Sequence, residues 1–132
     1  MQDLIQQPFK APENERPKNY EFIGYHLMAS YWGCQYEALN NEKTLIIAMK
    51  SAVEASGATL LNYIKHAFPQ RGVTLVMLLA ESHSSIHTYP EHGACFVDLF
   101  TCGRSCSSEE FSKSLQSYLK PEKVDSQVLV RR

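Results

Sequence analysis

Residues 73–101 read VTLVMLLAESHSSIHTYPEHGACFVDLFT, and this stretch decides the fold. Its first part, residues 73–80, is almost wholly apolar and of strand length, as is typical of a strand inside a sheet. Residues 84–89 and 94–101 are two further strand-forming segments, and the Pro-Glu-His-Gly sequence between them predicts a hairpin loop. Successive strands joined by short turns indicate a mostly antiparallel sheet.

Two amphipathic helices are predicted on either side of this stretch. Residues 42–56 follow two asparagines that are natural N-caps, end before Gly57 and carry their apolar residues on one stripe. The second helix begins after the capping box formed by Ser107 and Glu110. Further strands are predicted at residues 20–29, 58–68 and 124–130, the last at an edge of the sheet. The order predicts an α+β fold: a two-layer sandwich with its helices on one face of the sheet.

The composition is that of one folded domain. The chain has 132 residues, of which 44% are hydrophobic and 20% charged, and 13 basic against 14 acidic side chains give a formal charge of -1. This balance of charges excludes nonspecific electrostatic binding to nucleic acid or to an anionic membrane. We expect a flexible arm over residues 1–19, a single domain over 20–132, and a cytoplasmic protein whose four cysteines are reduced thiols.

The second face of the predicted sheet requires a partner. Residues 73–80 and 94–101 are apolar on both faces, whereas two helices can cover only one. A twofold homodimer that packs sheet on sheet, giving an α/β/β/α sandwich, would bury the other face. On a regular strand Ser82 and His87, five residues apart, point to opposite faces, so we expect an active site that is shared between two chains.

The densest collection of reactive side chains lies at residues 80–103. A metal site made by His83, His87 and His92 is disfavoured, because on a strand the first two are more than ~13 Å apart at 3.3 Å per residue. A hydrolytic triad of Ser82, His87 and Asp98 has the right residue types, but the Gly-x-Ser-x-Gly elbow is missing around the serine. We expect no metal site here.

One ordered set of motifs in this segment resembles a known family. The set comprises Glu-Ser-His at 81–83, Ile-His-Thr at 86–88, Pro-Glu at 90–91 and Asp-Leu-Phe-Thr-Cys-Gly at 98–103. Together with Gly-Tyr-His-Leu at 24–27 and Ser-Gly-Ala-Thr at 56–59, it resembles the short prokaryotic S-adenosylmethionine decarboxylases, which are homodimeric pyruvoyl enzymes. The resemblance covers about four-fifths of the chain.

The resemblance implies self-processing followed by decarboxylation. Family members cleave themselves before the serine of the Glu-Ser pair, here Glu81 and Ser82, and convert that serine to a covalent pyruvoyl group. The group serves as the electron sink when the substrate loses CO2. The product supplies aminopropyl groups for the synthesis of spermidine and other polyamines.

The resemblance also assigns roles to individual residues. His87 and Thr74 assist processing, and Cys102 protonates the substrate after CO2 leaves. Phe68 and Glu91 contact adenine and ribose, and Tyr89 replaces a common tryptophan beside them. Thr74 stands where a serine is usual, and it keeps the hydroxyl but has a stiffer χ1.

Two alternative functions stay open at this point. The same fold and cofactor could act on another amino acid, such as ornithine or arginine, although such a pocket would have no use for Phe68 or Glu91. A non-catalytic partner subunit that activates a homologue would be expected to lack Ser82 or Cys102, and this chain has both.

Overall fold

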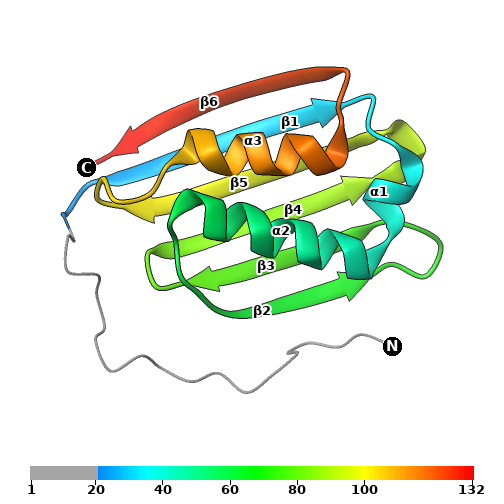
Figure 1. Ribbon diagram of the computed structural model, residues 1–132. Coiled ribbons are helices and arrows are strands. Elements are labelled where there is room, and N and C mark those ends of the chain that lie inside the picture. Colours follow the sequence, from blue (N-terminus) through cyan, green and yellow to red (C-terminus); the bar gives the residue numbers. More distant parts are fainter. Residues whose placement is uncertain (1–20) are drawn as a thin grey trace.

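The fold is built around a six-stranded antiparallel sheet (Figure 1). The computed structural model describes residues 21–132, so the predicted arm at 1–19 lies outside the described residues. The strands lie in the order β2-β3-β4-β5-β1-β6. Their bounds are β1 Gly24–Trp32, β2 Leu60–Ala67, β3 Val73–Leu79, β4 Ser82–Tyr89, β5 Ala94–Cys102 and β6 Lys123–Arg131. This order confirms the α+β class and the edge position of the last strand.

The helices pack together on one face of this sheet. The two long helices are α2 (Glu42–Ser56) and α3 (Ser108–Leu119), which lie side by side over the sheet, and the short α1 (Tyr36–Asn40) contacts both (Figure 1). The side chain of Asn41 caps α2 by accepting a hydrogen bond from the Thr44 N–H, and Gly57 ends this helix with a left-handed φ of 90°. The predicted bounds of α2 are therefore confirmed.

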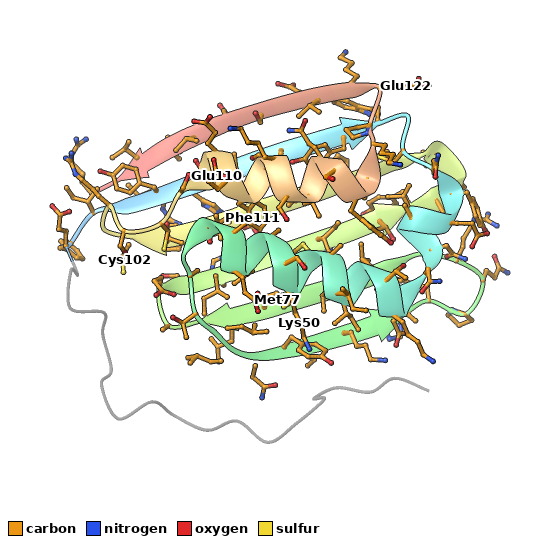
Figure 2. The ribbon with its side chains drawn as sticks, viewed as in Figure 1. Lys50, Met77, Cys102, Glu110, Phe111 and Glu122 are labelled. Carbon is orange, nitrogen blue, oxygen red and sulfur yellow. The ribbon has the colours of Figure 1, made fainter. Side chains whose placement is uncertain are left out.

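Side-chain burial alternates along β3 between the two faces of the sheet. Val73, Leu75, Met77 and Leu79 are buried, and Figure 2 labels Met77 beneath the helix layer, with Phe111 of α3 also in the core. Leu78, between two of these residues, is 41% exposed. Successive strand residues point to opposite faces, so one face forms the core with the helices and the other stays open.

The open face carries apolar side chains as well as polar ones. Leu78, Phe96 and Leu129 are all more than 40% exposed there, and Ile64 is 39% exposed. Within residues 21–132 no helix covers this face, since the three α-helices contact one another on the opposite side. The prediction of a sheet with one uncovered, partly apolar face is confirmed.

Some of the predicted boundaries were wrong. The strand predicted at 84–89 begins two residues earlier, because Ser82 and His83 pair with Thr101 and Phe100 of β5. The strand predicted from residue 20 begins at Gly24 and continues to Trp32.

Candidate active site

The turn that joins β3 to β4 holds the predicted cleavage point. Only Ala80 and Glu81 separate the two strands, and Leu79 pairs directly with Ser82. Two-residue hairpins favour residues that tolerate positive φ, and neither Ala80 nor Glu81 is of that kind. The positive φ falls instead on Ser82, at 147°, a conformation that a residue with a Cβ rarely adopts.

Hydrogen bonds hold both the side chain and the carbonyl oxygen of Glu81. Its side chain is 6% exposed and accepts a hydrogen bond from the Thr59 N–H at 2.9 Å. Its carbonyl oxygen accepts the Cys102 N–H at 3.1 Å. The carbonyl that precedes Ser82 is thus polarised by a backbone donor, the arrangement that stabilises negative charge developing on such an oxygen.

Cys102 lies beside this turn at the end of β5, where Figure 2 labels it. Its side chain is 9% exposed. Residue 101, its neighbour, is the pairing partner of Ser82 across β4 and β5. Ser82 and Cys102 consequently line one cavity of about 310 Å³, which we call the serine cavity. Its other lining residues are Glu21, Phe22, Ile23, Gly24, Phe100, Arg131 and Arg132.

The remaining predicted residues gather around a second cavity of about 490 Å³, which we call the histidine cavity. It is lined by residues from β3, β4 and the turns at their ends, including Phe68, Thr74, His87, Tyr89 and Glu91. Thr74 and His87 lie opposite each other on adjacent strands, with Thr74 Oγ1 and His87 Nδ1 3.2 Å apart. The structure therefore brings these five predicted residues together.

Charge and exposed aromatic surface mark the histidine cavity. Glu91 lies on the short 3₁₀ turn η1 (Pro90–His92), with a carboxylate oxygen 3.7 Å from the Nε of Arg71. The Phe68 ring is 49% exposed and meets His66 edge-on at 4.6 Å between ring centroids. An exposed aromatic face next to a carboxylate can bind a ligand that has both a flat ring and hydroxyl groups.

The two cavities do not meet within one chain. Ser82 and His87 are five residues apart on β4, which corresponds to about 16 Å at about 3.3 Å per residue. The separation runs along the strand, which puts the two side chains at opposite ends of the sheet. One chain holds two incomplete halves of the predicted site.

Between the cavities lies a polar cluster that sequence reasoning missed. The Asp98 carboxylate is 2.8 Å from His26 Nε2 and 3.4 Å from His83 Nε2, and it accepts a hydrogen bond from Ser85 Oγ at 2.7 Å. Burial raises the pKa of Asp98, but the hydrogen bonds of His26 and Ser85 and the charge of His83 outweigh it and leave the pKa lowered. Asp98 thus bonds to these groups and forms no triad with His87.

The same cluster is the one place among residues 21–132 where three metal-ligand side chains converge. The candidate ligand atoms of His26, His83 and Asp98 all lie within 4.8 Å of one another. The alternating side chains of β4 could be predicted from the sequence. The place of His26 in this cluster could not, because it depends on the pairing of β1 with β5. His87 and His92, which the sequence analysis considered with His83 and disfavoured as a metal site, are not in this cluster.

Comparison with known proteins identifies the family. The family model for S-adenosylmethionine decarboxylase matches residues 25–132. The chain belongs to the S-adenosylmethionine decarboxylase family. A relative named S-adenosylmethionine decarboxylase proenzyme from Methanococcus maripaludis strain C7 is 42% identical over 103 residues, which cover 78% of this chain and 84% of that protein.

Bacterial relatives and a solved structure agree with this family. A proenzyme of the same name from Brevibacillus brevis is 42% identical over 112 residues, which cover 85% of this chain and 84% of that protein. The crystal structure of the adenosylmethionine decarboxylase from Aquifex aeolicus superposes with a TM-score of 0.76 at 32% identity, covering 81% of this chain and 88% of that one. The resemblance inferred from the motifs is confirmed.

Two further findings bear on the predicted setting. Within residues 21–132 no helix is both long and apolar enough to cross a bilayer. All four cysteines are free thiols, three of them buried, as expected.

Proposed function

We propose that this chain is a proenzyme that cleaves itself between Glu81 and Ser82, acquires a pyruvoyl group from Ser82 and decarboxylates S-adenosylmethionine. The backbone at Ser82 carries this proposal. A φ of 147° at a non-glycine residue is strain that a fold retains where the surroundings enforce it, and such residues cluster at reactive sites. Here the strained residue, Ser82, also carries the hydroxyl that the proposed cleavage uses as its nucleophile.

The cleavage uses groups that the structure already holds in place. Ser82 Oγ attacks the carbonyl carbon of Glu81, the C–N bond breaks, and an ester replaces the amide. The Cys102 N–H stabilises the negative charge on the Glu81 oxygen during this attack. Loss of the Ser82 Cα proton then expels the Glu81 carboxylate and leaves dehydroalanine, which water hydrolyses to the pyruvoyl group and ammonia. The products are chains of 81 and 51 residues, the latter from 132 − 81.

The serine cavity fits the group that this reaction makes. A pyruvoyl at position 82 needs only the volume of the serine it replaces, and the cavity leaves space for the amino-acid end of a substrate beside it. The ketone of the pyruvoyl group serves as the electron sink for the pair left by CO2. Cys102, with its nearly buried thiol in the same cavity, donates the proton that the substrate carbon then takes.

We further propose a twofold homodimer in which each site combines two chains. No helix within residues 21–132 covers the open sheet face, which is partly apolar, so a second copy packed sheet on sheet would bury it. A twofold axis near the middle of β4 exchanges its ends, which brings the serine cavity of one chain to the histidine cavity of its partner. Thr74 and His87 of the partner would then reach Ser82. The separation of Ser82 from His87 within one chain would thus be a requirement of the shared site.

The histidine cavity favours an adenosine-bearing substrate. Phe68 and Tyr89 offer exposed rings for stacking on adenine, and Glu91 offers carboxylate oxygens to ribose hydroxyls. Ornithine or arginine would leave the aromatic surface unused. The product of S-adenosylmethionine decarboxylation is an aminopropyl donor for polyamine synthesis, which we propose as the role of the protein.

Intact mass and CO2 release test the proposal together. The purified chain should give two fragments split between residues 81 and 82, and it should release CO2 from S-adenosylmethionine but not from ornithine or arginine. Ser82→Ala should remain a single inactive chain, whereas Ser117→Ala, which changes an exposed serine on α3, should split and turn over normally. An unbroken chain with full activity would refute the proposal.

A further inference from the structure

Arg131, a residue that the sequence analysis did not single out, lies across the sheet from the serine cavity's thiol. It pairs with Gly24 on β1, and Gly24 pairs on its other side with Cys102 on β5. The three residues therefore form one row across three strands. Both outer side chains lie on the open face, because the flanking Val130 and Thr101 pair with Tyr25 on the helix face.

The glycine in this row creates the space between the two side chains. A Cβ at Gly24 would lie 2.4 Å from the Phe100 ring and 3.5 Å from the Arg131 Cβ. Any other residue at this position would therefore displace the ring and fill the gap. The Cα atoms of Cys102 and Arg131, two strand spacings apart, are about 10 Å from each other. A small charged group fits between a thiol and a guanidinium at that separation.

The Arg131 guanidinium is positioned but has no carboxylate partner within residues 21–132. Its Cζ lies 4.7 Å from the centroid of the Phe100 ring, a contact that holds one face of the guanidinium group. None of the ion pairs in this part of the chain includes it. The one acidic side chain that lines the serine cavity, that of Glu21, lies 3.8 Å from Arg104 instead. The forked N–H groups of Arg131 can therefore bind an anion.

We propose that Arg131 binds the α-carboxylate of the substrate. This inference rests on the proposed function, which places the substrate α-carbon beside position 82 and Cys102 and hence its carboxylate in the serine cavity. The adenosine end then extends to the histidine cavity of the partner. Arg131 consequently fixes the direction in which the substrate lies, with its anionic end at the arginine and its cationic sulfonium away from it.

The inference predicts different effects on substrate and product. The carboxylate is present in S-adenosylmethionine and absent from its decarboxylated product, so Arg131 can strengthen the binding of the first only. Arg131→Gln should raise the KM for the substrate roughly 10- to 100-fold, the range for a lost hydrogen bond to a charged group. The carboxylate stays beside Arg131 until the C–C bond breaks, so the contact is largely kept in the transition state and kcat should stay within about threefold of the wild-type value. The Kd of the product should change less than about twofold.

Calorimetry separates this role from a structural one. Product affinity is measured on processed wild type and Arg131→Gln, and substrate affinity on the uncleaved Ser82→Ala chain with and without Arg131→Gln. Arg131→Lys, which keeps the charge but not the fork, should lie between. Lys123→Gln is the matched control, since it removes the cation 5.2 Å from the Trp32 ring at the other end of β6. It should leave both affinities unchanged.

The outcomes distinguish this inference from the proposed function. Equal losses of substrate and product affinity in Arg131→Gln, or no loss of either, would overturn the carboxylate role while cleavage and CO2 release by the wild type continue. A wild-type chain that neither splits after residue 81 nor releases CO2 would instead overturn the proposed function.

Discussion

The serine cavity and the histidine cavity lie at opposite ends of β4 and differ in how they are built. At the serine cavity the main chain is strained at Ser82 and donates a hydrogen bond to the Glu81 carbonyl, so the backbone itself is prepared for reaction. At the histidine cavity the strands are regular, and exposed side chains such as Phe68 and Glu91 make the surface. In the proposed function the serine cavity holds the reacting groups, and the histidine cavity binds substrate and transfers protons.

Under the proposed function, neither cavity would be sufficient alone. A reactive serine without a nearby acid or base stays inert, and a binding surface without a nucleophile does no chemistry. Because the two halves lie about 16 Å apart on one strand, the proposed homodimer would make activity depend on a second copy of the chain. The following variants test the division, starting with the largest effect.

Cys102→Ala should separate cleavage from turnover most sharply. The variant loses the proposed proton donor of the serine cavity, so turnover should fall by roughly 10²–10⁴, the usual contribution of a positioned general acid. Cleavage should persist, because the Cys102 N–H remains. Single-turnover rates and intact mass measure the two effects. Cys106→Ala is the matched control, and normal turnover in Cys102→Ala would assign the proton to another group.

His87→Ala should show the reverse defect. Its imidazole, 3.2 Å from Thr74 Oγ1, is the group proposed to assist processing from the partner chain. We expect cleavage to slow by roughly 10²-fold, the lower range for acid–base assistance. Time courses of intact mass follow this rate, with His92→Ala on the neighbouring turn as control. Cleavage at the normal rate would remove His87 from the processing reaction.

Phe68→Ala should weaken binding without affecting cleavage. Loss of a stacking ring should raise KM about fivefold, in line with about 1 kcal/mol for an aromatic pair beyond its area. Phe68→Tyr keeps the ring and should restore KM. If both variants matched the wild type, the adenosine end would have to bind elsewhere.

Asp98→Asn tests the region between the cavities and should have the smallest effect. Because the folded-state pKa of Asp98 is lowered, its contribution to stability is present above the unfolded value of about 3.9 and is lost as the pH falls through the folded value. Asp98→Asn should therefore be less stable at neutral pH and show a shallower loss below about pH 4. Urea unfolding between pH 3 and 7 measures this. Asp125→Asn, exposed on β6, should keep the wild-type slope.

Local sequence signals were enough for much of the fold. Asn41 and Gly57 mark the ends of α2, and the apolar run at 73–80 gave β3 within one residue. The five-residue α1 was missed because it is too short for periodicity, and no side chain caps its first turn.

The candidate site was predictable where motifs carry it. Ser82, His87 and Cys102 followed from the family resemblance, whereas the Asp98 cluster and the Arg131 row did not. Both depend on the register of β1 with β5 and β6, which joins residues more than 70 positions apart. Strand pairing at such sequence separations leaves no local pattern to read.

Complementation between two inactive chains tests the shared site most directly. Cys102→Ala and Glu91→Ala are co-expressed with different affinity tags, and heterodimers are isolated through both. One of the two sites then has both changes, while the other has Cys102 from one chain and Glu91 from its partner, both intact. We expect about half the wild-type activity per dimer, because one of the two shared sites is intact. Clean heterodimers with no more activity than either parent would contradict it.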